Sequence, residues 1–204
     1  MSSIARPFSQ ACENNKQPIL AVLQRWLKTG DKVLEIGSGT GQHARFFAEE
    51  LASVHWQTTD VADNLPGIEA WRAGYAGDNL PGPLPLDVRD PDWGVEIPEA
   101  VFSANSLHIM AFSAVEILFA QLGRHAPLGN TLLIYGPFNY NGAYTSESNA
   151  RFDQWLAQQH PDSAIRDFEA VNALALQAGY ELCEDNAMPA NNRLLVWRKI
   201  RVPV

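Results

Sequence analysis

A glycine-rich turn between an apolar strand and an amphipathic helix constrains the fold of this chain most. Residues 33–36 read Val-Leu-Glu-Ile, the turn follows as Gly37-Ser38-Gly39-Thr40-Gly41, and a helix is expected over 42–52. A strand that ends in such a turn leaves free backbone N–H groups at a helix N-terminus, where a polar ligand can bind. Glycine allows the tight bend and the close approach of that ligand. The turn therefore predicts a ligand site at the carboxyl end of the strand.

Strands and helices alternate along the rest of the chain. Short apolar strands separated by helices are typical of a parallel sheet covered on both faces. The last two strands lie too close for a helical crossover, which favours an antiparallel hairpin. The pattern predicts an α/β fold, a Rossmann-like three-layer α/β/α sandwich with a seven-stranded, mostly parallel sheet and an antiparallel C-terminal hairpin. We expect helices over 18–27, 42–52, 63–75, 113–125, 149–159 and 163–178, and strands over 32–36, 55–59, a segment ending near 87, 100–104, 131–135, 180–186 and 193–201.

Composition narrows the class of protein. Of the 204 residues, 46% are hydrophobic and 19% are charged, which is typical of a globular chain. Two cysteines are too few for a disulfide framework or a metal cluster. The net charge of −8 disfavours general nucleic-acid binding. No apolar run approaches the ~20 residues of a membrane helix, and no signal pattern opens the chain. We expect one cytoplasmic domain over 1–204, with no metal, nucleic-acid or membrane partner and an oligomeric state that stays open.

The spacing of the turn separates classes of nucleotide site. Gln42 stands where the dinucleotide fingerprint requires its third glycine, and the Gly-Lys-Ser/Thr ending of a phosphate-binding P-loop is absent. Glu35 would lie unfavourably beside a pyrophosphate but suits a ligand with a cationic portion. A nicotinamide-dependent oxidoreductase is therefore the disfavoured alternative.

The E-x-G-x-G-x-G arrangement of residues 35–41 resembles motif I of the class I S-adenosylmethionine-dependent methyltransferases. The resemblance implies that the turn cradles the methionine part of S-adenosylmethionine. It also implies that Asp60, after the second strand, bonds the ribose hydroxyls, and that Asp87, after the third, approaches the adenine. The cofactor-binding residues expected on this basis are Glu35, Gly37, Ser38, Gly39, Gly41, Asp60, Val61, Asp87, Val88 and Asn105.

Further segments spread over nearly the whole chain carry a narrower resemblance. They are 15–20 (Asn-Lys-Gln-Pro-Ile-Leu), 39–43, 56–57, 105–108, 135–137 running on to 141–142, 148–149, 152–153, 166–167 and 188–192 (Met-Pro-Ala-Asn-Asn). As a set they are similar to the methyltransferase-like protein 26 family, formerly a domain of unknown function. Asn14 departs from that family, which has arginine there, and receives no role. The resemblance implies the family's fold and leaves its substrate and reaction open.

Two further residues near the turn are expected to contact the cofactor. Lys16 belongs to a candidate N-terminal lid over 1–17, with its ammonium group near the cofactor's carboxylate. His43 lies in the first turn of the helix after the glycines. The alternatives are an ordinary leader and a histidine on the helix surface.

Polar residues on loops are the candidate catalytic and substrate-binding groups. His108 follows the fourth strand, where sheets of this kind place their ligand crevice, and histidine titrates near neutral pH. His108 could therefore act as a base, and a hydrogen bond to a loop is the alternative. Tyr140 is the second catalytic candidate, within a candidate substrate-loop insertion over 138–160. A neutral pocket for a small-molecule acceptor would be formed by Asn141, Asn149, Asn191 and Asn192.

Two functions follow from these features. The first is an S-adenosylmethionine-dependent methyltransferase that acts on a small molecule. The second is a non-enzymatic S-adenosylmethionine-binding or scaffold protein of the same fold. The second stays open because the Asn-Pro-Pro-Tyr signature of amino-methylating enzymes is missing at residues 105–108.

Overall fold

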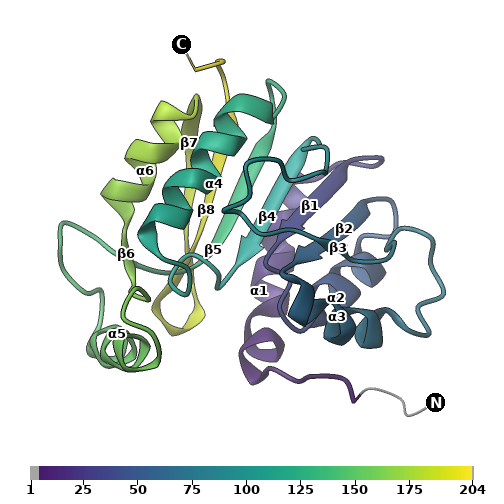
Figure 1. Cartoon of the computed structure of the whole chain (residues 1–204), viewed down its shortest axis with the longest axis horizontal. Coiled ribbons are helices and arrows are strands. Elements are labelled where there is room, and N and C mark those ends of the chain that lie inside the picture. Colours follow the sequence, from purple (N-terminus) through teal and green to yellow (C-terminus); the bar gives the residue numbers. More distant parts are fainter. Residues whose placement is uncertain (1–4, 204) are drawn as a thin grey trace. The chain divides into compact units, whose positions relative to one another are not determined.

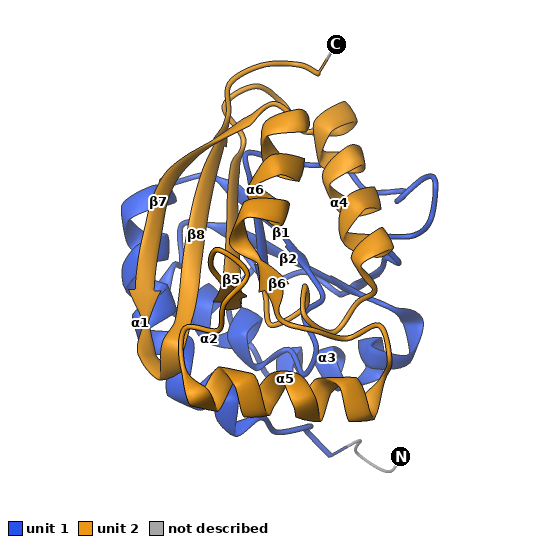
Figure 2. Ribbon diagram, turned by 90° about the vertical axis from the view of Figure 1, so that its left-hand side faces the viewer, with its two compact units in different colours: residues 1–103 blue, residues 104–204 orange. Residues whose placement is uncertain are grey.

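The computed structural model describes residues 5–203, and the chain divides into two compact units, residues 1–103 and 104–204 (Figure 2). Unit 1 alternates its first helices and strands, and α1, α2 and α3 lie in the purple-to-blue part of the chain in Figure 1. Its elements are α1 (Gln10–Trp26), β1 (Lys32–Ile36), α2 (Gln42–Glu50), β2 (His55–Asp60), the 3₁₀ turn η1 (Ala62–Asn64), α3 (Leu65–Arg72), β3 (Leu84–Pro85) and β4 (Ala100–Ala104), the last residue of which opens unit 2.

The strands of unit 1 are parallel, in the order β3-β2-β1-β4. Val33 of β1 pairs with Trp56 of β2 on one side and with Ala100 of β4 on the other. On one face, Phe47 of α2 packs against Trp56 and Phe102, with ring centroids 5.2 and 5.7 Å apart. This aromatic cluster is fully buried, so it fixes α2 over the strands that carry the glycine turn.

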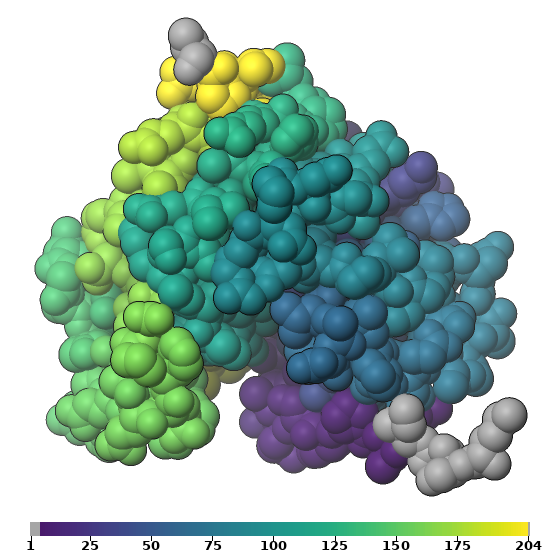
Figure 3. Space-filling view, in the orientation of Figure 1, coloured from purple at the N-terminus to yellow at the C-terminus, as the bar shows by residue number. Residues whose placement is uncertain are grey.

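The opposite face of these strands is covered by the segment 86–99, which has no helix. Figure 3 shows this segment in dark teal on the side facing the viewer. Trp93 and Ile97 bury their side chains there. A pocket of about 420 Å³ lies between the segment and the strands. Its lining includes Lys32, Leu34, His55, Gln57, Gly94, Val95, Glu96 and Pro98.

Unit 2 is built on an antiparallel hairpin. Its strand β8 runs between β5 and β7 and is antiparallel to both, while β6 pairs parallel to the end of β5. Figure 2 shows α4 and α6 side by side over these strands, where Phe119 of α4 and Asn172 of α6 both contact Trp197 of β8. The elements are α4 (Phe112–His125), β5 (Thr131–Asn139), α5 (Glu147–Gln159), β6 (Arg166–Asp167), α6 (Phe168–Gln177), β7 (Tyr180–Met188), the 3₁₀ turn η2 (Pro189–Asn191) and β8 (Asn192–Lys199).

The predicted fold class is confirmed as α/β and Rossmann-like, with mostly parallel strands and an antiparallel C-terminal hairpin. The described residues hold eight strands instead of seven, because the two-residue β6 gives no periodic signal in the sequence. Helix α4 begins at Phe112, one residue before the predicted start, and no side chain caps it. Among residues 5–203, no helix has the length and apolar character needed to cross a membrane. The single domain stays a prediction.

Helix α1 begins eight residues earlier than predicted. Ser9 caps it by accepting a hydrogen bond from the N–H of Cys12, and Glu13 adds a negative charge in the first turn. Pro18 therefore lies inside the helix and not at its start. Of the candidate lid, residues 10–17 are helical, and hydrogen bonds from Arg6 and to Pro7 hold these two residues against α3. Residues 1–4 of the candidate lid lie outside the described residues.

Candidate functional site

Three acidic residues lie at one edge of the parallel strands of unit 1. Glu35 is the second-last residue of β1, Asp60 ends β2, and Asp87 follows β3 by two residues. Backbone hydrogen bonds hold these strand ends together. The N–H groups of Gly37 and Ser38 donate to the carbonyl of Thr59, and that of Leu86 donates to the carbonyl of Asp60. The structure thus brings together the three strand ends to which the sequence assigns the cofactor.

Gly39 and Gly41 of the turn have different structural roles. Gly39 and Gly41 both have positive φ, at 57° and 85°. A Cβ on Gly41 would lie 2.9 Å from the Cα of Ile68, so this glycine allows α2 and α3 to pack closely. No atom lies within 4 Å of a Cβ built on Gly39. The space beside Gly39 therefore fits the close approach of a ligand to the backbone.

Asp60 braces the turn. Its Oδ2 accepts a 2.7 Å hydrogen bond from the N–H of Gly39, and its Oδ1 accepts from the N–H of Val61 and from Asn64 Nδ2, both at 2.8 Å. A carboxylate has about four acceptor positions, so these three bonds leave room for one further donor. Asp60 can hold the turn and bind a ligand hydroxyl at once.

Glu35 is a buried carboxyl behind the turn. Its Oε2 accepts hydrogen bonds from Ser38 Oγ at 2.9 Å and Trp56 Nε1 at 3.0 Å. Burial raises the pKa of Glu35 to about 7, an effect that these two bonds oppose and the charge of Asp60 reinforces. A cationic ligand beside the turn would favour the ionised carboxylate.

The remaining predicted residues of this edge differ in their surroundings. Asp87 forms a two-pronged ion pair with the guanidinium of Arg89, which lowers the pKa of the carboxyl. Val61 exposes 41% of its surface beside Asp60, whereas Val88 is buried. Asp87 is therefore charged but already partnered, and a ligand there would share it with Arg89.

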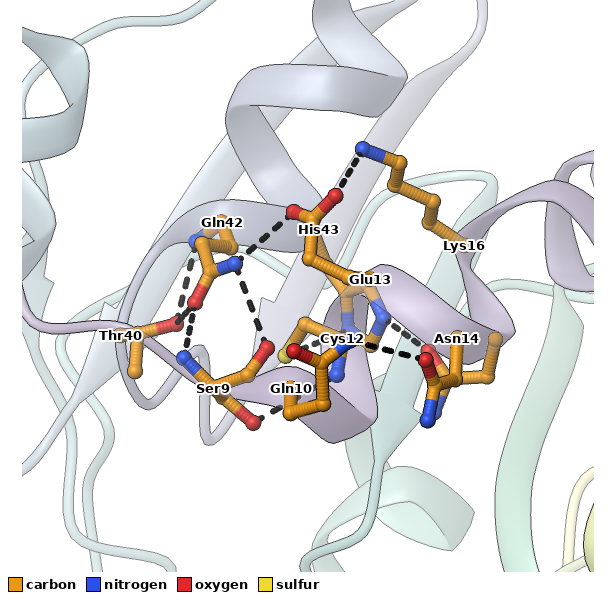
Figure 4. A network of polar contacts seen from close by, with 10 residues as sticks. Ser9, Gln10, Cys12, Glu13, Asn14, Lys16, Thr40, Gln42 and His43 are labelled. Atoms are coloured by element: carbon orange, nitrogen blue, oxygen red, sulfur yellow. Dashed lines mark hydrogen bonds and ion pairs between the residues drawn. The ribbon is translucent and has the colours of Figure 1, made fainter.

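Lys16 of α1 and His43 of α2 both lie where these two helices pack together (Figure 4). Lys16 Nζ lies 2.5 Å from Glu13 Oε2 and 4.9 Å from the ring centre of Phe46. His43 is 5% exposed, so the alternative of a surface histidine is wrong. Gln42 has a role that the sequence did not indicate, because it exchanges hydrogen bonds with the backbone of Ser9 and donates to Glu13.

In unit 2, Asn105 and His108 lie beside the middle of β5. Asn105 has a left-handed backbone, with φ at 59°, and its N–H donates to the carbonyl of Tyr135. His108 is buried, and its ring contacts that of Phe152 with centroids 5.4 Å apart. Burial and the charge of Arg166 lower the pKa of His108 to about 4. At neutral pH it is a free imidazole, which can accept a proton but is a weak base.

Tyr140 is held in a polar cluster. Its hydroxyl donates to Asp185 Oδ2 at 2.8 Å, and its ring stacks on Phe168 with centroids 5.1 Å apart. Arg193 donates to the other carboxylate oxygen of Asp185 and lies over the Tyr140 ring. Burial and the carboxylate of Asp185 raise the pKa of Tyr140, so the phenol stays protonated and suits a hydrogen-bond donor better than a base.

The four candidate acceptor asparagines are only partly brought together. Asn149 Nδ2 donates to the carbonyl of Asn191, which joins the start of α5 to the tip of the β7–β8 hairpin. Asn192 instead bonds within the tip, to the carbonyl of Pro189, and the N–H of Asn141 donates to Glu169 of α6. Three residues of these loops have a left-handed backbone, namely Asn141, Ala190 and Asn191. Strained backbone of this kind clusters at functional sites.

Asn139 is a candidate that the sequence did not indicate. It is the last residue of β5, and its Oδ1 is buried without a hydrogen-bond partner among the described residues. An unmet buried acceptor is costly and marks a place where a ligand can donate. The signal was hidden because the strand was expected to end at 135.

Known proteins resemble this chain at two levels. The sequence profile of a family described as "Protein of unknown function (DUF938)" matches residues 6–199. Among solved structures, an O-methyltransferase family protein from Burkholderia thailandensis is similar with a TM-score of 0.75 at 14% identity, over 91% of this chain and 56% of that one.

Two further structures agree with this likeness. The O-methyltransferase family 2 protein from Planctomyces limnophilus, in complex with apigenin, has a TM-score of 0.73 at 15% identity over 92% of this chain and 62% of that one. Human N-acetylserotonin methyltransferase, in complex with S-adenosylmethionine, has a TM-score of 0.72 at 13% identity, over 91% of this chain and 55% of that one. The chain thus spans little more than half the length of these structures, and the likeness shows a shared methyltransferase fold.

Proposed function

The chain belongs to the DUF938 family, whose function is unknown, and from that starting point we propose that it is an S-adenosylmethionine-dependent methyltransferase of a small-molecule acceptor. The observation that carries the proposal is the glycine turn. It leaves open space beside Gly39 and bonds that glycine to Asp60, within a fold shared with methyltransferases. The narrower likeness to the methyltransferase-like protein 26 family is part of the same proposal.

The residues of unit 1 fit this cofactor in their chemistry. Bound S-adenosylmethionine would supply a methyl group made electrophilic by its sulfonium centre. Glu35 would oppose the cofactor's positive charge from behind the turn, and Asp60 would accept from one ribose hydroxyl with its remaining acceptor position. Asp87, which Arg89 already pairs, would approach the adenine.

The residues of unit 2 fit a neutral, hydroxyl-bearing acceptor. Methyl transfer is an in-line displacement, so holding the acceptor in line supplies much of the rate enhancement. His108, a free imidazole, would take the hydroxyl proton as the bond to the methyl carbon forms. Asn149 and Asn191 would orient the acceptor by hydrogen bonds, and Asn105 would line the methionine end of the cofactor. The names of the similar structures, two of them O-methyltransferases, support this acceptor class.

A non-enzymatic cofactor-binding protein is the second candidate. It is favoured by one observation in unit 2, namely that neither catalytic candidate is a strong base. The pKa of His108 is lowered, and the hydroxyl of Tyr140 is bonded to Asp185. Turnover separates this candidate from the first.

Thermal unfolding with added ligands tests the cofactor first. We expect S-adenosylmethionine and its demethylated product to raise the unfolding midpoint, since a ligand at about 100 times its Kd stabilises the folded state by about 2.7 kcal/mol. A nicotinamide cofactor should give no shift. A shift with the nicotinamide cofactor alone would overturn the assignment of the turn.

An acceptor screen then tests turnover. Release of the demethylated product is followed with a set of small phenols, alcohols and carboxylic acids. Acceptor-dependent release establishes the methyltransferase. Binding of the cofactor without release across the set favours the second candidate.

A further inference from the structure

A cysteine and a histidine from different helices of unit 1 face each other beside the glycine turn (Figure 4). Cys12 lies in the first turn of α1, and its Sγ is 3.9 Å from Nδ1 of His43 in α2. The other ring nitrogen of His43, Nε2, lies 2.6 Å from Asn15 Oδ1. An amide oxygen only accepts hydrogen bonds, so Nε2 carries the ring proton and the lone pair of Nδ1 points to the thiol.

The histidine ring is fixed in this orientation. His43 and Asn15 are each 5% exposed. The ring stacks on Phe47 at 5.3 Å and meets the edge of Phe102 at 6.5 Å. Cys12 is only partly buried, so the residue is not sealed inside the protein. A nucleophile within reach of a base that a third group orients is the general arrangement of nucleophilic catalysis, and Cys-His-Asn is one of its variants.

The charges around the pair keep it neutral. Glu13 of α1 and Glu35 of β1 face the thiol, and Glu13 and Lys16 of α1 face the imidazole. Burial raises the pKa of the Cys12 thiol and lowers that of His43 to about 4. Near neutral pH the pair is therefore a thiol beside a free imidazole, and the thiol proton must leave while the sulfur reacts.

We propose that Cys12 is a base-assisted thiol that exchanges with small disulfides. Its Sγ attacks one sulfur of the disulfide, the S–S bond breaks, and Nδ1 of His43 takes the thiol proton. The departing thiolate then receives that proton, so the products are a mixed disulfide on Cys12 and one free thiol. Asn15 is a positioning residue, because it holds the tautomer and orientation of the ring.

The pH dependence of the exchange tests the proposal in the full chain. The probe is a pyridyl disulfide, whose released thione absorbs light. Cys183→Ser leaves Cys12 as the reporting thiol, and Cys12→Ser leaves Cys183, which is exposed and is a matched control. We expect the Cys12 rate to vary less than about threefold between about pH 5.5 and 8.5, because the neutral pair persists over this range.

The control thiol, Cys183, should show a different pH dependence if His43 acts as the base for Cys12. The Cys183 rate should rise about tenfold per pH unit, since only its thiolate fraction reacts. A Cys12 rate that climbs with the same slope would overturn the proposal. This comparison needs no change at His43 or Asn15, so it holds even where such variants fold poorly.

Two substitutions at Asn15 separate positioning from packing. Asn15→Leu removes the acceptor of the histidine N–H and should lower the Cys12 rate at neutral pH at least about tenfold and restore the pH slope. Asn15→Asp keeps an acceptor at the same place and should recover the rate and the flat profile. A folded Asn15→Leu protein with the original rate and profile would contradict the role of the triad.

Discussion

At the scale of single residues, Asp60 links the glycine turn to the proposed cofactor. We expect Asp60→Ala to weaken S-adenosylmethionine binding by roughly 1–3 kcal/mol, because the hydrogen bond from the ribose to its carboxylate is lost. The N–H of Gly39 loses its acceptor as well, so the turn is loosened. Isothermal titration calorimetry measures the affinity. Asp63→Ala, three residues further on and exposed, should bind like the parent protein. Unchanged affinity in a folded Asp60→Ala protein would contradict the placement.

Substitution of Asn139 tests whether this residue serves acceptor binding or the stability of the fold. Its Oδ1 is buried and unpaired among the described residues, so Asn139→Ala removes an unsatisfied group and should leave the free energy of unfolding equal or higher. If this oxygen receives a donor from the acceptor molecule, the same change raises the KM for that acceptor about tenfold. Urea unfolding and steady-state kinetics measure the two effects. Loss of stability with unchanged KM would assign Asn139 to the fold alone.

The sequence predicts residue types at strand ends well and their partners poorly. Glu35, Asp60 and Asp87 lie at neighbouring strand ends because parallel strands meet at one edge, which the order of motifs already implies. That Arg193 and Asp185 would hold Tyr140 could not be foreseen. Tyr140 and Asp185 lie 45 residues apart in the chain, and the contact between Asp185 and Arg193 depends on the register of β7 with β8.

At the scale of elements, the errors occur where a local signal opposes tertiary contacts. Pro18 suggests a helix start, yet the Ser9 cap and the contact with α2 carry α1 through it. Pro137 suggests the end of a strand, yet it pairs opposite Asn192 and β5 continues to Asn139. Tertiary packing overrides propensity in both cases.

The packing of α2 on α3 can be tested at the turn that precedes α2. Gly41→Ala should lower the free energy of unfolding by roughly 1–3 kcal/mol more than Gly39→Ala does. Both glycines have positive φ, but only a Cβ on Gly41 meets Ile68, at 2.9 Å. Gly39→Ala should act chiefly on cofactor binding, because its Cβ enters open space. Urea unfolding of both variants measures the difference, and equal losses would contradict the packing argument.

At the scale of the whole molecule, buried ionisable groups give stability a pH dependence. Glu35 binds its proton more tightly in the folded protein, where the pKa is about 7, than its ordinary value of 4.5. The folded state then holds a proton that the unfolded state lacks, so stability falls as pH rises through this window. Buried His43 and His108, whose pKa values are about 4, act in the opposite sense below pH 6.5.

Glu35→Gln isolates one of these contributions. The histidines are common to both proteins, so their effect cancels in the difference between variant and parent. As the pH rises from 4.5 to 7, we expect the unfolding free energy of Glu35→Gln to increase by about 3 kcal/mol relative to that of the parent. Above pH 7 this difference should stay constant. Urea unfolding across this range measures the gain. Glu116→Gln, an exposed carboxyl on α4, should show no such trend, and neither should Glu35→Gln if its carboxyl titrates normally.

Apart from Asn105, every residue proposed to hold the cofactor precedes residue 103, and every proposed acceptor residue follows it. A ribosome therefore completes the glycine turn and its three acids before it adds the first acceptor-binding side chain. Chain halves of this kind tend to fold in the order of their synthesis. During translation, S-adenosylmethionine would meet the nearly complete edge proposed to bind it while the half with the proposed acceptor residues is still being made.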